Sequence, residues 1–464
     1  MTIYDSVSKT KQNFEPITPG KTTLYVCGPT VYDDAHLGHA KSALVFDLLV
    51  RVLKANGLDV TFARNITDID DKIVKKLSET GQTLQELTEF YIKAYHRDMD
   101  ALGIMRPDIE PKATESMDAM VSLISNLIEK GHAYKTVDGD VYFDTHNDKK
   151  YLSISKRIQD QDDTQSRIEE NTQKKNPADF ALWKHFDEGL SYETSFSKGR
   201  PGWHTECAAM IDEHLAVEGD YAIDIHGGGA DLLFPHHENE AAQHRCAKDQ
   251  ELAKYWMHNG FVNIDGEKMS KSLGNSFFLK DALKAYHGEV LRFYLSSTHY
   301  RGDFNFNELD LLASKKRLDK LYRLKKRLFG MKITEEKTDF QKKLLEALSD
   351  DLNISVALSL VDEMISKANE TLDSNPKDKL IKRQSLADMA YIEKLLGLGL
   401  QNPFEYFQFG IDDELKANID RLIEKRSIAK AEKDFARSDA LRDELLALDI
   451  SIMDTAQGTF WEKN

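Results

Sequence analysis

The chain has 464 residues, of which 41% are hydrophobic and 30% are charged, which is the composition of a folded globular protein. This length predicts two to four domains, and we expect no membrane partner because no apolar run is long enough to span a bilayer. The formal net charge of −16 argues against indiscriminate nucleic-acid binding, because phosphate contacts need local lysines and arginines.

The first predicted strand leads to a short histidine–glycine motif. Residues 22–26 form a β-rich run and residues 40–54 show helical apolar spacing, with His36, Gly38 and His39 between them. A helix start presents free N–H groups and a positive dipole end to an anion, glycine permits close approach, and two imidazoles can reach phosphate oxygens. The motif indicates a phosphate site, although a turn with two surface histidines would look the same.

The next segments predict a nucleotide-binding fold with an insertion. An alternation of strands and helices along the chain is typical of a parallel sheet. This alternation is interrupted between about 110 and 198, where a helix over 112–130 and a polar stretch over 149–175 predict an insertion between two halves of the fold. The later β-rich runs are residues 59–64, 139–144, 221–225 and 260–264.

A second motif, Lys-Met-Ser-Lys-Ser at 268–272, follows the last of these strands. Lys268 and Lys271 carry mobile ammonium groups that suit a polyphosphate, although an exposed basic loop is the alternative. Taken with the histidine motif, this lysine motif indicates a binding site for a nucleoside triphosphate. Together, and in this order, the two motifs resemble the signature pair of class I aminoacyl-tRNA synthetases.

The C-terminal third is predicted to be helical. Amphipathic, charged segments from 306 to 396 indicate a bundle, and its basic clusters at 315–317 and 323–327 are either a stripe for a polyanion or a solvated face. The segment from Pro403 is expected to contain a helical pair over 419–446 and a short tail. Phe460 and Trp461 in the tail could stack on bases or anchor it to the helices, and Arg437 and Arg442 could contact a nucleic-acid backbone.

Cysteine and histidine positions indicate a metal site. Cys27 ends the first strand, and Cys207 lies in the run 203–207. Pro235 suits the first turn of a helix on which His236 and Glu240, at i and i+4, share one face. Two thiolates, an imidazole and a carboxylate would make a tetrahedral zinc site.

The spacing leaves other ligand sets open. His244 is four residues beyond Glu240, and His237 with Glu238 is another local choice. Isolated cysteines are also often buried apolar residues, and Cys246 lies outside every motif. Because three cysteines are too few for a disulfide framework and the N-terminus lacks a secretory pattern, we expect a cytoplasmic protein.

Five stretches resemble the cysteinyl-tRNA synthetase family, and the match runs in order through nearly the whole chain. They are residues 27–33, 64–72, 201–207, 226–232 and 234–240. The resemblance implies one zinc ion per chain and leaves His237 and His244 outside the ligand set. The zinc ligands that it implies are Cys27, Cys207, His236 and Glu240.

The resemblance implies that cysteine is joined to the α-phosphate of ATP, which carries Mg²⁺, and is then passed to the 3′ end of tRNA(Cys). It assigns catalytic roles to His36, His39, Lys268 and Lys271. The implied ATP-binding residues are Gly38, Gly228, Gly229, Asp231 and Lys271, although the glycines would also suit a tight turn at a strand end. The implied amino-acid pocket contains Thr67, Trp203 and His226; alone, Trp203 would suit the core and Thr67 a turn or cap.

Zinc would explain how cysteine is distinguished from serine. An apolar pocket separates such near-isosteres by only about 10²-fold. A metal with an open position lowers the pKa of a thiol and binds the thiolate, and serine has no comparable soft anion. We therefore expect selection without an editing domain.

The predicted fold class is α/β: a Rossmann-like parallel-sheet catalytic domain with an insertion, then a helical bundle and a small anticodon-binding domain. The expected division is 1–110 and 199–305 for the catalytic halves, 111–198 for the insertion, 306–400 for the bundle and 401–464 for anticodon recognition. The resemblance also suggests a monomer. The alternatives are a cysteine ligase of the mycothiol pathway, which lacks the full C-terminus, and a non-catalytic relative that binds tRNA or zinc.

Overall fold

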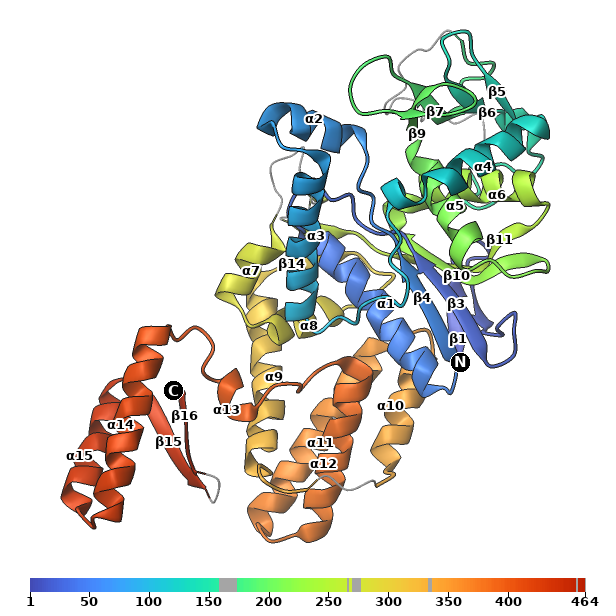
Figure 1. The fold of residues 1–464 in the computed structure, drawn as a ribbon. Coiled ribbons are helices and arrows are strands. Elements are labelled where there is room, and N and C mark those ends of the chain that lie inside the picture. The colour runs from blue at the N-terminus through green and yellow to red at the C-terminus, as the bar shows by residue number, and fades with distance from the viewer. Residues whose placement is uncertain (158–172, 265–266, 269–276, 333–335, 456–457, 464) are drawn as a thin grey trace.

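The computed structural model describes residues 1–157, 173–264, 267–268, 277–332, 336–455 and 458–463. At its centre lies a parallel four-stranded sheet in the order β11, β10, β3, β4 (Figure 1). Two strands precede the insertion and two follow it, so both predicted halves share one sheet, and the α/β fold class is confirmed. The strands are β3 (Lys21–Val26), β4 (Asp59–Arg64), β10 (Tyr221–Gly229) and β11 (Glu251–Asn259).

Burial explains why β3 forms an inner strand. Leu24, Tyr25 and Val26 are all fully buried, as expected where a parallel sheet is covered on both faces. The register pairs Val26 with Arg64 of β4 and with Gly227 of β10, so the strands end together at one edge.

Two strand predictions need correction. The strand expected over 221–225 continues to Gly229, so the glycines lie in β10 and not in a turn. The strand expected over 260–264 is reduced to β12 (Val262–Ile264), because the sheet strand β11 lies just before it. β12 pairs instead with β13 (Glu267–Lys268) and β14 (Phe304–Phe306) in a separate small sheet.

Helix α1 (Leu37–Ala55) packs on the sheet and is the central helix of the molecule (Figure 1). It is buried over most of its surface because the sheet lies on one side and α8, α10 and α12 lie against the others. The remaining N-terminal elements are β1 (Thr2–Asp5), β2 (Thr10–Asn13), α2 (Asp71–Thr80) and α3 (Leu84–Ala101).

The insertion forms a five-stranded antiparallel sheet at the top of Figure 1. Helix α4 (Met117–Glu129) starts later than the predicted residue 112, because Ala113–Glu115 form a 3₁₀ turn. The other elements of the insertion are β5 (Ala133–Lys135), β6 (Val141–Phe143), a 3₁₀ turn at Thr145–Asn147, β7 (Phe180–His185), β8 (Tyr192–Glu193) and β9 (Lys198–Pro201), and α5 (Trp203–His214) follows it.

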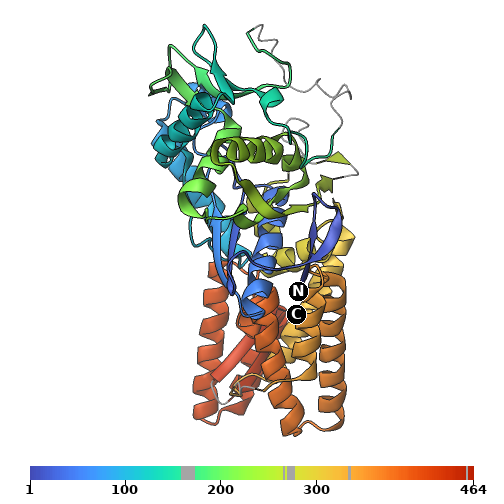
Figure 2. The same cartoon turned by 90° about the vertical axis from the view of Figure 1, so that its right-hand side faces the viewer.

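The predicted helical region is present, and its long helices lie side by side below the sheet (Figure 2). None of the described helices combines the length and apolar character needed to cross a membrane. The helices of this region are α9 (Glu308–Arg327), α10 (Asp339–Ser349), α11 (Ile354–Ser374) and α12 (Lys379–Leu396), and α7 (Leu279–Ala285) and α8 (Gly288–Ser296) precede it.

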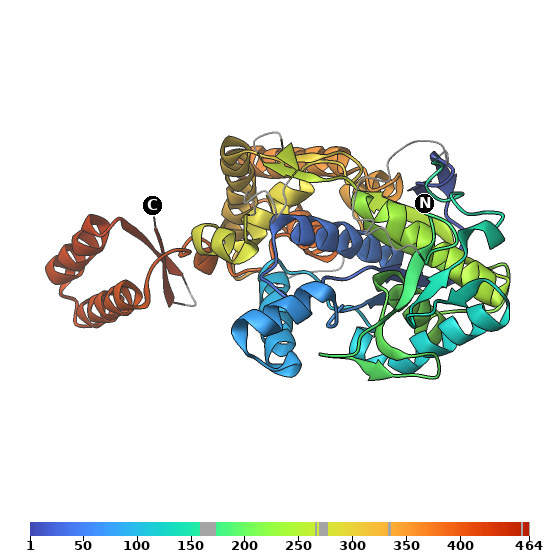
Figure 3. The ribbon, with the colours of Figure 1, turned by 90° about the horizontal axis from the view of Figure 1, so that it is seen from above.

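A small terminal unit extends to one side of the molecule (Figure 3). The predicted helical pair is present, but the predicted tail is a β-hairpin. Its side chains anchor it: Trp461 Nε1 donates to Asp420 Oδ1 at 3.0 Å, and the Phe460 ring stacks on Phe404 with centroids 4.3 Å apart. The elements are α13 (Pro403–Tyr406), α14 (Asp413–Ala431), α15 (Phe435–Ala447), β15 (Ile450–Thr455) and β16 (Gly458–Lys463).

A buried ion pair joins α1 to α8. Arg292 of α8 is 2% exposed and pairs with Asp47 of α1, which also accepts from Arg51 Nε at 2.8 Å. Arg292 Nε donates to the Leu396 carbonyl at the end of α12, at 2.7 Å. One buried guanidinium therefore holds three helices together.

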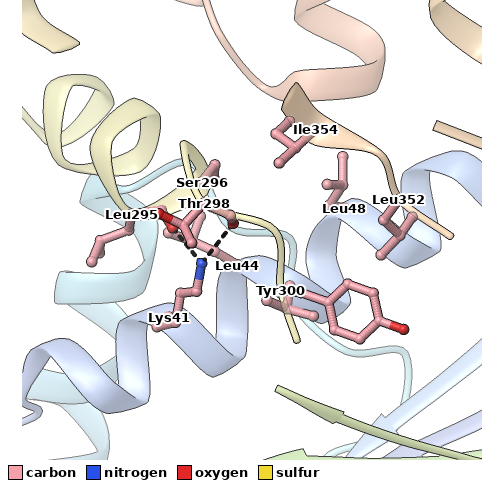
Figure 4. A pocket seen from close by; sticks show the side chains of 10 residues that line it. Lys41, Leu44, Leu48, Leu295, Ser296, Thr298, Tyr300, Leu352 and Ile354 are labelled. Atoms are coloured by element: carbon pink, nitrogen blue, oxygen red, sulfur yellow. Dashed lines mark hydrogen bonds between the residues drawn. The ribbon is translucent and has the colours of Figure 1, made fainter. Parts of the chain in front are cut away.

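Lys41 makes a second link between α1 and α8 (Figure 4). Its ammonium group is buried and donates to the carbonyls of Leu295 and Thr298, at 2.7 and 3.2 Å. These carbonyls lie at the end of α8, where positive charge is favourable. Burial lowers the pKa of Lys41 to about 8.

We predict that Arg292→Met destabilises the protein by about 3–5 kcal/mol, because it leaves the Asp47 carboxylate buried without its main partner. The double variant Asp47→Leu/Arg292→Met should recover part of this loss, since no buried charge remains. Thermal unfolding measures both. Lys343→Met, which removes the exposed pair with Asp339, is the control and should leave the midpoint unchanged. A double variant less stable than Arg292→Met would contradict the prediction.

Candidate metal centre and nucleotide site

The predicted metal ligands meet at the carboxyl edge of the parallel sheet. Cys27 follows β3, and Cys207 lies on α5 beneath the insertion. A π-type turn at Leu233–His237 leads into α6 (Glu238–Lys248) and puts His236 one turn before Glu240. Ligands of parallel α/β sheets bind at this edge.

The four side chains converge on one point. The sulfur atoms of Cys27 and Cys207 are 3.7 Å apart. His236 Nε2 lies 3.7 Å from Cys207 Sγ and 2.8 Å from Glu240 Oε1. One ligand atom from each of the four lies within 4.8 Å of the other three, and three of the residues are buried. This donor set is chemically suited to a tetrahedral zinc ion.

A second, overlapping set lies beside the first. It consists of Cys27, His226, His237 and Glu240, which satisfy the same 4.8 Å criterion. His237, which the family resemblance leaves outside the ligands, has its Nε2 only 3.4 Å from Cys27 Sγ. His244 belongs to neither set, and its Nε2 lies 3.2 Å from Gln250 Oε1.

Charge is distributed unevenly within the cluster. A hydrogen bond from Cys27 lowers the pKa of Cys207 to about 6, while burial raises the pKa of Cys27. Burial opposes ionisation of both His236 and Glu240, but their mutual attraction prevails: the pKa of His236 rises to about 10 and that of Glu240 falls well below its usual value. Cys207 and Glu240 are therefore the donors of the cluster whose anionic forms are most favoured, as a bound cation requires.

Additional histidines support the cluster. His204 Nδ1 lies 2.9 Å from His236 Nδ1, and His258 Nε2 lies 2.8 Å from His237 Nδ1. Burial lowers the pKa of both supporting histidines to about 3, so they are neutral near pH 7. Such partners fix the orientation of a ligating imidazole. Sequence reasoning missed this role, because His258 comes from the unpredicted strand β11, and the stretch 201–207 does not indicate which residue His204 contacts.

The residues expected to bind the amino acid surround this cluster. Trp203 is 40% exposed and stacks on His236 with ring centroids 4.2 Å apart. His226 Nε2 lies 2.6 Å from Glu240 Oε2. Thr67 Oγ1 donates to the buried Glu206 at 2.7 Å, a partner that no sequence pattern indicated.

The two expected histidines of the nucleotide site lie together at the start of α1. His36 caps the helix by accepting from Gly38 N at 3.1 Å, and its ring stacks on that of His39 with centroids 3.8 Å apart. Both imidazoles are therefore fixed at the positive end of a long buried helix.

The second motif is only partly described. Lys268 lies in β13, and Lys271 lies outside the described residues. The chain just after the motif pairs with the start of α1: Leu279 N donates to Ala35 O at 2.8 Å, and Leu37 N donates to Phe277 O at 3.3 Å. The fold thus brings the neighbourhoods of the two motifs together.

The glycines of β10 let neighbouring side chains pack closely against the strand beside the metal cluster. A Cβ on Gly228 would lie 3.0 Å from the His237 ring and 2.9 Å from Leu232, and one on Gly229 would lie 2.5 Å from Asp231. Asp231 follows in a 3₁₀ turn at Ala230–Leu232. These three expected ATP contacts therefore lie at the same sheet edge as the cluster.

Comparison with known proteins identifies the family. Residues 13–316 match the model of the class I (C) tRNA synthetase catalytic domain, residues 343–401 match a DALR domain, and residues 412–461 match the anticodon-binding domain of cysteinyl-tRNA ligase. A cysteine–tRNA ligase from Sulfurimonas denitrificans is 65% identical over the full length of both chains, and one from a Sulfurovum species is 61% identical over the same extent. The chain belongs to the cysteine–tRNA ligase family.

The family resemblance drawn from the sequence is confirmed, and the chain is an enzyme of the class I aminoacyl-tRNA synthetases. Solved structures agree on the fold. A methionyl-tRNA synthetase from Mycobacterium tuberculosis in complex with methionyl-adenylate gives a TM-score of 0.57 at 15% identity, covering 81% of this chain and 92% of that one. A LeuRS from Agrobacterium radiobacter in a ternary complex gives 0.60 at 12% identity, with coverage of 85% and 86%.

We predict that the protein retains a divalent metal on purification and that Cys207→Ser weakens its binding by more than the about 10- to 100-fold typical of a lost supporting residue. The reason is that a hard hydroxyl replaces a soft thiolate ligand. Elemental analysis and competition with a chelating dye measure this change. Cys246→Ser is the matched control, since Cys246 is buried but belongs to neither ligand set. Equal metal affinity in the two variants would contradict the prediction.

Proposed function

We propose that this cysteine–tRNA ligase activates L-cysteine with ATP and transfers it to tRNA(Cys), and that one zinc ion selects the amino acid. The convergence of Cys27, Cys207, His236 and Glu240 within 4.8 Å is the observation that supports this most strongly. We choose this set over the overlapping one because it contains two thiolate donors, which zinc favours, and because it agrees with the family resemblance.

When bound, zinc supplies a positive, thiophilic centre for the thiolate of cysteine. The side chains around it orient the substrate. Trp203 is accessible above His236 and offers a flat apolar wall. His226 contacts Glu240, and the Thr67 hydroxyl donates to Glu206, which fixes its oxygen beside Asn65. We assign Thr67, Trp203 and His226 to the amino-acid pocket.

Activation joins the cysteine carboxylate to the α-phosphate of ATP and releases pyrophosphate. Such a displacement depends mainly on alignment and charge neutralisation. We assign His36 and His39 to the phosphate oxygens, because they stack at the start of α1. Lys268 and Lys271 are assigned to the pyrophosphate, and Mg²⁺ accompanies the ATP. Gly38, Gly228, Gly229 and Asp231 are assigned to the nucleotide.

The C-terminal third suits a tRNA substrate. The match of residues 412–461 to an anticodon-binding model supports the expected division, in which 401–464 reads the anticodon and 306–400 forms the bundle. We retain the boundaries 1–110, 111–198 and 199–305 for the catalytic halves and their insertion. We also propose that the enzyme acts as a monomer in the cytoplasm, where its three free cysteines stay reduced.

We predict that cysteine-dependent exchange between ATP and pyrophosphate exceeds serine-dependent exchange by at least about 10⁴-fold, which corresponds to about 5.5 kcal/mol. Exhaustive removal of the metal should abolish cysteine-dependent exchange, and added zinc should restore it. Measurement of kcat/KM for both amino acids tests the proposal. A ratio of only about 10²-fold is what an apolar pocket alone would give and would contradict selection by zinc. Full activity after chelation would contradict it equally.

We also predict that labelled cysteine is transferred to tRNA(Cys) and not to glucosaminyl-inositol. This experiment separates the tRNA enzyme from the ligase of the mycothiol pathway, which shares the catalytic half. Filter binding of labelled tRNA and chromatography of the amino sugar measure the two products. An intact, metal-loaded protein without cysteine-dependent exchange would instead indicate the non-catalytic relative.

A further inference from the structure

Arg64 is a buried charge at the edge of the sheet where the substrates meet. It is the last residue of β4 and pairs in register with Val26, the residue before Cys27. Asn65 and Thr67 follow it and connect to the site: Asn65 Oδ1 accepts from Gly28 N at 2.8 Å, and Asn65 Nδ2 donates to Thr67 Oγ1 at 3.3 Å. Arg64 thus adjoins the expected amino-acid pocket.

The guanidinium of Arg64 lacks the protein partners that other buried arginines have. Arg64 is 4% exposed, and its buried Nη2 has no hydrogen-bond partner among the described residues. Within the same part of the chain, no carboxylate lies within ion-pair distance of it. By contrast, the comparably buried Arg292 and Arg426 pair with Asp47 and Asp454. Burying a cation without an anion is costly, so this position calls for an anionic ligand.

Local packing holds the side chain in place. The guanidinium carbon lies 5.1 Å from the centroid of the Phe62 ring, within the range of a cation–π contact. On the other side, a Cβ on Gly28 would lie 3.3 Å from Arg64 Cγ and only 1.6 Å from the Asn65 carbonyl oxygen. Only glycine therefore lets the loop after Cys27 pass so close to Arg64.

Sheet geometry puts Arg64 on the same side as the nucleotide motif. Alternate residues of a strand share a face, so Arg64 lies on the face of Phe62, which belongs to the core cluster under α1. Because α1 follows β3 and connects it to the parallel strand β4, its first residues lie near the carboxyl edge of the sheet and its last residues near the opposite edge. His36 and His39 flank the start of α1 at that edge, so Arg64 and the histidine motif lie on the same face and at the same edge of the sheet.

We propose that Arg64 is a substrate-binding residue that donates hydrogen bonds to the oxyanion of the reacting centre, either the cysteine carboxylate or the α-phosphate to which it becomes joined. Both are planar or tetrahedral oxyanions that an arginine fork recognises. Arg64 keeps its protons throughout, while the carboxylate oxygen bonds to phosphorus and the bond to pyrophosphate breaks. The inference rests on the ATP-dependent activation proposed above and does not depend on zinc.

The test compares ligands that differ by a single oxyanion, in the full-length metal-loaded protein. One pair is cysteine and cysteamine, which lacks the carboxylate, and the other is AMP and adenosine, which lacks the phosphate. We expect Arg64→Met to weaken one anionic ligand by about 10- to 100-fold and to leave its neutral counterpart nearly unchanged. If the affinity for cysteine falls, Arg64 binds the carboxylate; if the affinity for AMP falls, Arg64 binds the α-phosphate. Calorimetric titration measures all four affinities.

Exchange kinetics give a second readout. Arg64→Met should lower kcat/KM by at least the loss seen in binding, and Arg64→Lys, which keeps the charge without the fork, should lower it less. If Arg64→Met fails to fold, Arg64→Lys and Arg64→Gln carry the ligand comparison. Arg426→Met is the control, because Arg426 is similarly buried but lies in the terminal unit, paired with Asp454. Cysteine-dependent exchange between ATP and pyrophosphate, measured without tRNA, should be unchanged in the Arg426→Met variant.

An equal loss for both members of each pair would assign Arg64 a structural role and overturn the proposal, as would no loss at all. The metal content of each variant is measured alongside. Wild-type protein that shows no exchange would contradict the proposed activation reaction itself. If the protein binds no metal but Arg64→Met still weakens only the anionic ligand, the result would contradict only the zinc proposal.

Discussion

The structure of the site depends on one constraint: two sulfurs, a carboxylate and several imidazoles are gathered at a sheet edge where all but one of the four ligands are buried. Glu240 and His236 are buried, and attraction between them lowers the pKa of Glu240 and raises that of His236, with His226 and Cys207 contributing in the same directions. Such a group of ionisable side chains needs rigid support from several directions. The end of β3, α5 and the start of α6 provide it, and the sheet holds these elements in fixed register.

Much of this arrangement could be predicted from the sequence, because local patterns determine much of it. The apolar run before Cys27 and the helical spacing after His39 specify a strand and helix that the structure contains. The spacing of His236 and Glu240 places them on one helical face. Sequence patterns failed where the tertiary partner decides: residues 251–259 look unremarkable until they pair with β10, and the terminal hairpin is held by Trp461 against Asp420.

The supporting residues show the same limit. His204, His258 and Glu206 act through contacts with residues 32, 21 and 139 positions away, which no periodicity reveals. Likewise, the proximity of His237 to Cys27 follows from how α6 docks on the sheet. A single sequence shows which side chains have the chemistry to bind a metal or a substrate, whereas the fold determines which of these side chains contact one another.

The connections around α12 have a mechanical consequence. Arg292 ties the last carbonyl of α12 to α1, and Glu289 accepts from the backbone N–H groups of Gly399 and Leu400 just beyond it, at 2.8 and 3.0 Å. Tyr322 of α9 then stacks on Tyr406 of α13 with centroids 3.8 Å apart. A continuous series of side-chain contacts thus connects the middle of α1 with the start of the terminal unit. A substrate long enough to contact both the catalytic site and the terminal unit would therefore have to match the distance between them, so its shape as well as its sequence would affect recognition.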